Sequence, residues 1–170
     1  VNHNIAGNFT LTAGAFTGTN YSYTLNGTSD QLVNLAIPIN KLSINKISGK
    51  VDLANDITVS NTLNFIQGII ETGSFEVILP IAANTTGAAQ STGWVKGNLT
   101  RNIPTGTAVS RSFDIGEASY APISIIFASI SIAGDITATT TSSDQPEIDY
   151  SGIDPDKSVN RFWSLNNSGI

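Results

Sequence analysis

The chain has 170 residues, of which 40% are hydrophobic and 12% charged, with no cysteine and a formal net charge of −5. This length suits one compact domain or two small ones and can supply a core without disulfides. The Lys and Arg residues are scattered, which argues against nucleic-acid binding. No run of about 18 apolar residues occurs, which argues against membrane insertion. Charged residues make up about a quarter of a typical soluble domain, so their scarcity, together with the abundance of Ile, Val, Thr, Ser and Asn, predicts an all-β fold.

A segment near the N-terminus recurs without a gap further along the chain. Residues 14–25 align with residues 68–79, and each copy has a Gly, two small or apolar residues, a polar corner containing Gly, and a strand with an aromatic residue at Tyr21 or Phe75. A recurring strand–corner–strand unit is typical of stacked β architectures, in which each unit buries one face against its neighbours.

The first half of the chain alternates between apolar and polar residues in short, evenly spaced runs. Pro38 falls within one of these runs, which predicts an edge strand or a bulge there because proline lacks a ladder donor. A spacing of roughly 20–27 residues per turn predicts a short parallel β-solenoid over residues 1–80, and a sandwich of similar hairpins is the alternative. The expected strands are 9–12, 21–25, 33–39, 42–45, 49–53, 57–59 and 62–65.

The second half of the chain has a different pattern. Residues 81–93 are small, polar and uncharged and are expected to form a linker, followed by an antiparallel β-sandwich over residues 94–170. A phase change in the apolar run that ends at Ile132 predicts a bulge near Ala128 and Ser129, or a turn there. The expected strands are 94–101, 110–115, 121–132, 134–141 and 161–165.

Motifs in both halves carry a family resemblance. The first half contains Leu42-Ser43-Ile44-Asn45 and Ile57-Thr58-Val59-Ser60-Asn61-Thr62-Leu63, and the second contains Gly93-Trp94-Val95-Lys96-Gly97-Asn98-Leu99-Thr100-Arg101 and Asn160-Arg161-Phe162-Trp163-Ser164-Leu165. These motifs resemble the repeat region, and the module after it, of large secreted surface proteins of Bacteroidetes and related phyla. The resemblance implies a secreted or cell-surface protein, commonly exported by the type IX route, that serves in adhesion, surface layers or extracellular fibres. It implies no catalytic residue.

An acidic stretch at residues 144–156 is the candidate metal site. Ca²⁺ takes six to eight oxygen ligands, which spaced carboxylates in a loop can supply. The spacing matches no EF-hand, and solvated loop charge is the alternative. The candidate Ca²⁺ ligands are Asp144, Glu147, Asp149, Asp154 and Asp156, and no other cofactor is indicated.

Four carboxylates of the predicted solenoid raise the possibility of a β-helical polysaccharide lyase or hydrolase: Asp52, Asp56, Glu71 and Glu76. Glycoside cleavage needs two carboxylates about 5–9.5 Å apart across a cleft. Glu71 and Glu76 are separated by a corner and are expected to point in different directions. The only histidine, His3, lies close to one end of the sequence, which argues against a Ser–His–Asp relay. The expectation is that the chain is not an enzyme.

Aromatic residues provide the candidate ligand surface. Trp94 follows Gly93 at the predicted junction and is the candidate for stacking on a glycan, whereas Phe65, Phe162 and Trp163 lie in apolar runs and are expected in the core. Glycosylation sequons begin at Asn8, Asn20, Asn26, Asn84, Asn98 and Asn166, as a chain rich in Asn, Ser and Thr readily produces.

The sequence therefore predicts a non-enzymatic extracellular structural module, a repeating unit of a surface adhesin, stalk or self-assembling fibre. Val1, Ile5 and Phe9 are apolar where a polar cap would be expected, and Gly169-Ile170 reads as the start of a further strand, so a longer polypeptide is expected. The expected partners are copies of the chain or neighbouring repeats of the same polypeptide. A carbohydrate-binding surface module is the alternative, and a β-helical lyase is the more remote one.

Overall fold

The computed structural model describes residues 1–14 and 21–170, and this part of the chain contains β-strands and two short 3₁₀ helices but no α-helix. The all-β prediction is confirmed. The strands are β1 (Asn2–Ile5), β2 (Phe9–Leu11), β3 (Ser22–Leu25), β4 (Gln31–Leu35), β5 (Ile39–Asn45), β6 (Val51–Leu53), β7 (Ile57–Gln67), β8 (Ile70–Leu79), β9 (Asn84–Thr86), β10 (Val95–Ile103), β11 (Gly106–Phe113), β12 (Ile115–Gly116), β13 (Ile123–Ile130), β14 (Gly134–Thr141) and β15 (Phe162–Ser168).

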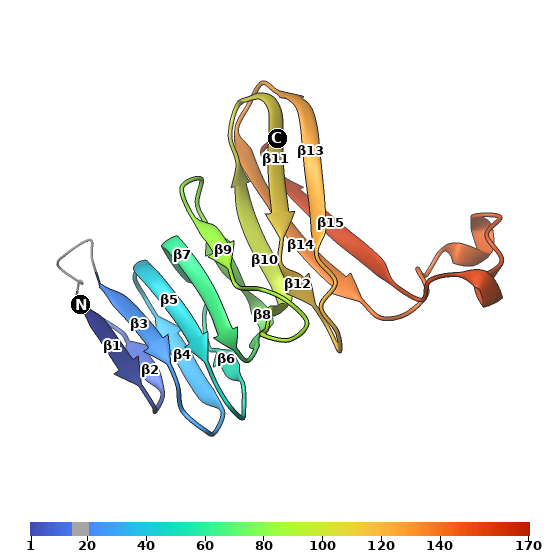
Figure 1. The fold of residues 1–170 in the computed structure, drawn as a ribbon. Coiled ribbons are helices and arrows are strands. Elements are labelled where there is room, and N and C mark those ends of the chain that lie inside the picture. The colour runs from blue at the N-terminus through green and yellow to red at the C-terminus, as the bar shows by residue number, and fades with distance from the viewer. Residues whose placement is uncertain (15–20) are drawn as a thin grey trace.

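The strands up to β10 form a parallel β-solenoid of about five turns. One ladder joins β1, β3, β5, β7 and β9, and a second joins β2, β4, β6, β8, β10 and β12, so that successive turns lie side by side (Figure 1). Facing residues are separated along the chain by 19 positions (Ser22 and Lys41) to 25 positions (Ile70 and Val95). The predicted solenoid and its repeat length are therefore confirmed.

The later turns, which contain β7, β8 and β10, have three faces. The start of β7 pairs with the end of β8, where Ile57 lies opposite Val77, whereas the second half of β7 pairs with β9. β8 bends in the same way at the exposed pair Gly73-Ser74. We call the β1–β3–β5–β7–β9 ladder the first face and the ladder from β2 to β12 the second face. The third face consists of the start of β7 and the ends of β8 and β10.

The core follows from the alternation of apolar and polar residues along these strands. Every second side chain on each face points inward, as the pleat of a strand requires, and stacks on its equivalents in the next turn. Phe65 is buried as expected from the sequence. Phe65 belongs to one buried hydrophobic cluster, which also includes Leu25, Val33, Leu42, Ile44, Val51, Val59, Leu63, Ile70, Val77, Val95 and Leu99.

Residues 81–93 differ from the predicted linker, because they complete the fifth turn of the solenoid. β9 pairs with β7 on the first face, and Ala83 is fully buried. The turn closes through backbone contact: Gly68 donates its N–H to the carbonyl of Thr92 at 2.7 Å, and a Cβ at Gly93 would overlap the carbonyl oxygen of Gly68. Close backbone approach of this kind requires glycine at position 93.

The region after residue 94 continues directly from the solenoid. β10 lies parallel to β8 on one side and antiparallel to β14 on the other, β14 pairs with β15, and β11 and β13 form a separate antiparallel pair. Phe113 and Ile115 belong to the same buried cluster as the solenoid core, so the core has no break at residue 94. The antiparallel pairing is as expected, while a sandwich over residues 94–170 stays a prediction.

The predicted bulge near Ala128 and Ser129 is absent from β13, which runs without interruption to Ile130 before a turn at 131–133. The irregular residue lies on the opposite strand, where Ala108 has a positive φ of 52°. Pro38 lies just before β5, outside the strands, because β4 ends at Leu35.

The long-range sequence repeat is not a structural repeat. Part of the first copy, residues 15–20, lies outside the described residues. In the part that is described, β3 lies on the first face, whereas the matching β8 crosses the second and third faces. Every turn needs a similar strand–corner–strand pattern, so two segments can match in sequence while lying on different faces.

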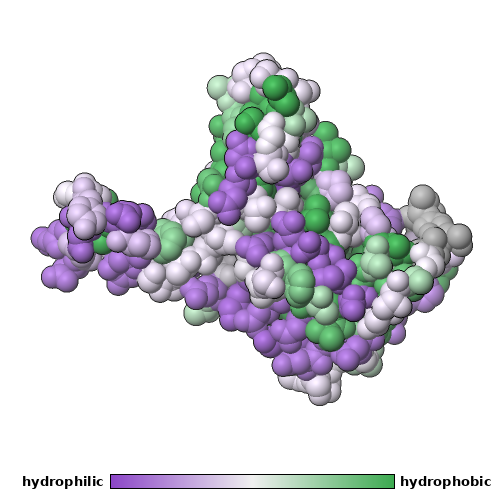
Figure 2. All heavy atoms as spheres, turned by 180° about the vertical axis from the view of Figure 1, so that it is seen from behind, coloured by the Kyte–Doolittle hydropathy of each residue, from purple (hydrophilic) through white to green (hydrophobic). Residues whose placement is uncertain are grey.

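A loop between β14 and β15 projects from the body of the molecule (Figure 1). It contains the 3₁₀ helices η1 (Ile148–Tyr150) and η2 (Pro155–Lys157), neither of which buries a residue. Figure 2 shows this projection as mostly hydrophilic. No helix in the described part is long and apolar enough to cross a bilayer.

Candidate functional site

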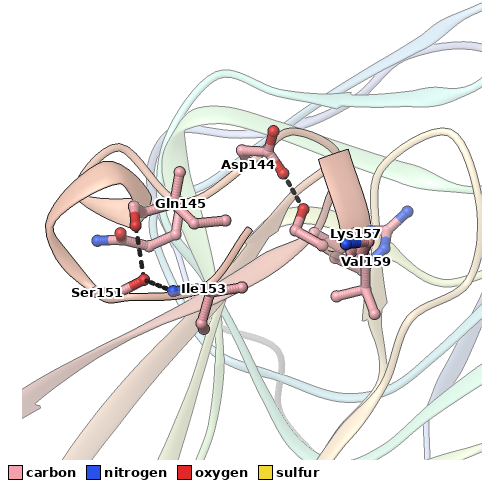
Figure 3. A pocket seen from close by; sticks show the side chains of 9 residues that line it. Asp144, Gln145, Ser151, Ile153, Lys157 and Val159 are labelled. Atoms are coloured by element: carbon pink, nitrogen blue, oxygen red, sulfur yellow. Dashed lines mark hydrogen bonds between the residues drawn. The ribbon is translucent and has the colours of Figure 1, made fainter. Parts of the chain in front are cut away.

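The acidic loop does not gather its carboxylates into a metal site. Asp144 accepts a hydrogen bond from the hydroxyl of Ser158 (Figure 3). Asp154 forms an ion pair with Lys157 at 2.7 Å. Asp154 also accepts a hydrogen bond from the backbone N–H of Asp156. In the described residues no group of three or more His, Cys, Asp or Glu side chains is arranged to hold a metal ion. The predicted Ca²⁺ ligands, which also include Glu147 and Asp149, are therefore not brought together.

A hollow of about 380 Å³ lies beside this loop. Ile148, Ile153 and Val159 line it together with the polar residues of Figure 3. Ile153 and Val159 are largely exposed to solvent, so the hollow is an open groove on the projecting loop.

Trp94 is buried, which corrects the expectation that it forms an exposed stacking platform. Its side chain is 7% exposed, and its ring lies 6.2 Å from that of Tyr120. The ring is covered because β12 lies against the start of β10, where Gly116 leaves room: a Cβ there would lie 2.6 Å from Trp94 Nε1. Trp163, expected in the core, is 37% exposed and donates from Nε1 to the carbonyl of Ala121.

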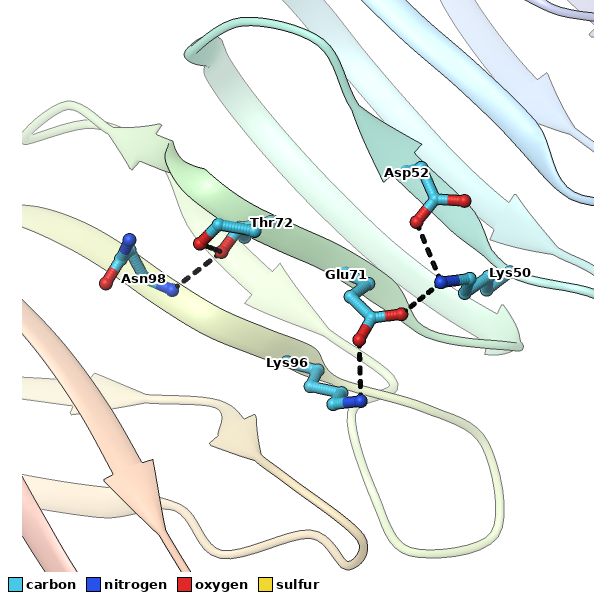
Figure 4. A network of polar contacts seen from close by, with 7 residues as sticks. Lys50, Asp52, Glu71, Thr72, Lys96 and Asn98 are labelled. Carbon is cyan, nitrogen blue, oxygen red and sulfur yellow. Dashed lines mark hydrogen bonds and ion pairs between the residues drawn. The ribbon is translucent and has the colours of Figure 1, made fainter.

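Two of the solenoid carboxylates form ion pairs on the second face (Figure 4). Glu71 accepts from both Lys50 and Lys96, and Lys50 also lies 3.0 Å from Asp52. These hydrogen bonds lower the pKa of Glu71, the bond from Lys50 most strongly, because both stabilise the ionised carboxylate. The network joins three successive turns and holds Glu71 in its charged form.

The other two carboxylates have different partners. Asp56 accepts a hydrogen bond from the backbone N–H of Glu76 at 3.1 Å, and Glu76 accepts from the hydroxyl of Thr100. Glu71 and Glu76 therefore lie on different faces, as their positions around the Gly73 corner indicated. His3 packs near the rings of Tyr21 and Tyr23 rather than beside a hydroxyl nucleophile.

Sequence reasoning did not identify two buried cations, although a signal for both was present. Lys46 lies on the same strand phase as Leu42 and Ile44, and Arg101 lies on the same phase as Leu99 and Ile103. A cation in the inward phase of a strand indicates a buried charge. Lys46 is 1% exposed and Arg101 6% exposed.

The ammonium of Lys46 fills the corner between the first and second faces. Nζ donates to the carbonyls of Gly27 and Ser29 at 2.8 and 2.7 Å and to Gln31 Oε1 at 2.9 Å. Burial lowers the pKa of Lys46, an effect that the charge of Asp30 partly opposes. All three N–H donors are satisfied, so this cation is a structural clamp between turns.

Arg101 lies beside a polar hollow of about 250 Å³ between the fifth turn and β11. Its two terminal nitrogens donate to the carbonyls of Ser112 and Ala83, each at 2.7 Å. Its Nε has no partner among the described residues. Arg111 and Asp114 line the same hollow.

Comparison with protein-family models, curated proteins and solved structures finds no match to this chain. The fold places the chain among proteins with a parallel β-solenoid, and the candidate sites rest on their geometry.

The continuous sheet ends in an open ladder on both sides. Within the described residues, β1 pairs only with β3, β2 only with β4, and β15 only with β14. β15 also carries two partly exposed apolar side chains, Trp163 and Leu165, the latter 44% exposed.

Proposed function

We propose that the chain is a non-enzymatic structural module of a secreted or cell-surface protein, a unit of an adhesin, stalk or fibre that stacks on neighbouring repeats of the same polypeptide or on copies of itself. The observation that carries this proposal is the pair of open ladders, β1 and β2 at one end and β15 at the other. The resemblance of the sequence motifs to secreted surface proteins supports the location.

Unpaired strand edges favour association. A row of free N–H and C=O groups is a template for another strand, and soluble proteins usually block such edges with charges, proline or a covering loop. The β15 edge has none of its own charged residues, since its sequence is FWSLNNS. Contact between two different edges does not close on itself, and repeated contacts of that kind build a filament.

Two apolar positions provide a matched test of edge association. Leu165→Lys places a charge on the β15 edge, and Ile81→Lys places the same charge at a position that is 57% exposed and outside every strand. We expect the unmodified chain and Ile81→Lys to form concentration-dependent oligomers or fibres, and Leu165→Lys to remain monomeric. Light-scattering mass and electron microscopy over a concentration series provide the measurement. A monomer at every concentration would overturn self-assembly of the chain.

Carbohydrate binding is the second candidate function, and the hollow beside Arg101 is the observation that favours it. Its lining is almost entirely polar and carries two guanidinium groups. A polysaccharide lyase has less support, because Glu71 and Asp52 are paired with lysines and Glu76 faces a different side of the solenoid.

A further inference from the structure

A polar hollow lies where the fifth turn of the solenoid meets β11, and we propose that it binds the carboxylate-bearing ring of an acidic sugar, such as a uronate residue of a surface polysaccharide. The residues that carry the argument are Asn84, Arg101, Arg111 and Asp114. The inference rests on the second candidate function and is independent of association through strand edges.

The first step is the missing counter-ion of Arg101. Its guanidinium is almost fully buried, and its partners are the carbonyls of Ala83 and Ser112 and, at 3.4 Å, the side-chain oxygen of Asn84. Ion pairs in the described part of the chain involve only lysines. Carbonyl groups solvate a cation without neutralising it, and a buried charge without an opposite charge is destabilising. An anion in the hollow would supply the missing charge.

The second step is the neighbouring guanidinium. Arg111 donates from Nε to the carbonyl of Asn102 and from Nη1 to that of Ser110, both at 2.9 Å. Burial lowers the pKa of Arg101, the charge of Arg111 lowers it further, and the charge of Asp114 partly opposes both effects. Arginine remains protonated in proteins, so both charges persist. A carboxylate between them would interact favourably with each.

The third step is the charge balance of the lining. Asp114 is the single carboxylate among the residues that line the hollow, against two guanidinium groups. Its Oδ1 accepts a hydrogen bond from the hydroxyl of Tyr120 at 2.5 Å, so this oxygen already has a partner, and the one negative charge of Asp114 cannot balance two guanidinium groups. The hollow therefore keeps an excess of positive charge.

The ligand class follows from these groups. Guanidinium binds a carboxylate through paired N–H donors, and amide and carboxylate side chains bind sugar hydroxyls. Asn84 and Asp114 are suited to the hydroxyls, and the two arginines are suited to the acid group. The lining contains no aromatic or large apolar residue, which disfavours an apolar ligand.

The test is a titration of the isotope-labelled chain by NMR with galacturonate, galactose and acetate. We expect galacturonate to shift the amides of β9, β11 and residue 114, acetate to bind more weakly, and galactose to produce no shift. Arg111→Gln should weaken galacturonate binding by about tenfold or more, because it removes a charge-assisted hydrogen bond. Lys157→Gln removes the same charge from a side chain that is 80% exposed in the projecting loop, and it should change nothing.

A variant that is expected to bind more strongly separates an effect on the site from damage to the fold. Asp114→Asn removes the opposing charge and should strengthen acetate binding, a result that damage to the fold cannot produce. Equal binding of galactose and galacturonate would overturn recognition of the acid group, and equal binding of acetate and galacturonate would overturn recognition of the sugar. Binding that is unchanged in a folded Arg111→Gln variant would overturn the site. The light-scattering mass of the same samples reports edge association separately.

Discussion

Lys46→Met tests whether a buried ammonium holds adjacent turns of the solenoid together. The substitution keeps most of the length and volume of the side chain and removes its three donors. Gln31 Oε1 retains a partner, because it also accepts from the backbone N–H of Gly27 at 2.8 Å. The carbonyls of Gly27 and Ser29 lose the ammonium, so two acceptors are affected.

The magnitude follows from these two acceptors. A buried polar group without its partner costs about 1–3 kcal/mol, which gives about 2–6 kcal/mol for two. Two effects reduce this cost: Ser29 is exposed and its carbonyl is only partly buried, so water can reach it, and methionine avoids the desolvation of an ammonium. We expect a net loss of about 2 kcal/mol in the free energy of unfolding, which corresponds to a fall of about 4–8 °C in Tm for a chain of this length.

The assay is urea unfolding followed by circular dichroism. We expect a lower midpoint at an unchanged m-value, with Lys157→Met as the exposed control within about 0.5 kcal/mol of the unmodified chain. A Lys46→Met variant as stable as the unmodified chain would refute the reasoning, because the ammonium would then cost as much to bury as its bonds return.

The same lysine predicts a pH dependence. Burial lowers the pKa of Lys46 in the folded state, so at alkaline pH the unfolded chain binds more protons than the folded one. Stability attributable to this group therefore rises with pH between the lowered pKa and the usual value of about 10.4. Lys46→Met should remove that rise, measured as the difference between the two chains across alkaline pH.

Two further substitutions test the close backbone approach in the fifth turn and the ion pairs of the second face. Gly93→Ala should destabilise the fold by about 3 kcal/mol or more, because the added Cβ overlaps the Gly68 carbonyl. Gly73→Ala is also at positive φ but has open space around it, and it should lose about 1–2 kcal/mol. Similar losses for the two variants in urea unfolding would contradict the packing argument. Glu71→Gln should be less stable than the unmodified chain near neutral pH, and the difference should shrink in acid: the lowered pKa of Glu71 gives a contribution that is complete above its usual pKa of about 4.3 and is lost as pH falls through the folded-state value. A difference that stays constant down to strongly acidic pH would exclude these ion pairs as its cause.

The solenoid was predictable because its signal is local. Inward residues such as Leu42, Ile44 and Leu63 alternate with polar ones, and corners recur at regular spacing, so the solenoid follows from the sequence. The strand bounds follow less well: the strand expected over 33–39 is divided between β4 and β5, and those expected over 57–59 and 62–65 form the single strand β7. The division of a turn into three faces was not predictable in this way, because it depends on which half of β7 pairs with which neighbour.

The predicted linker at 81–93 and the predicted exposure of Trp94 differ from the structure for one physical reason. The fifth turn between 81 and 93 is closed by glycine backbones and by a single buried Ala83, so it lacks the apolar pattern from which the other turns were recognised. Trp94 is covered by β12, which is about 20 residues further along the chain. Both features depend on contacts between segments that are distant in sequence, which periodicity within one segment does not encode.

The two buried cations show how the same signal leads to two different roles. Lys46 has three N–H donors and three acceptors at 2.7 to 2.9 Å, so its hydrogen bonding is complete and nothing further is needed at that corner. Arg101 has five N–H donors, two strong carbonyl partners and one long contact, and its Nε has no partner among the described residues. Lys46 closes an interior corner, whereas Arg101 borders a hollow that it shares with a second arginine. Access to a hollow is thus the property that separates a structural clamp from a candidate ligand site, and on that criterion Arg101 is the buried charge for which a partner should be sought outside the chain.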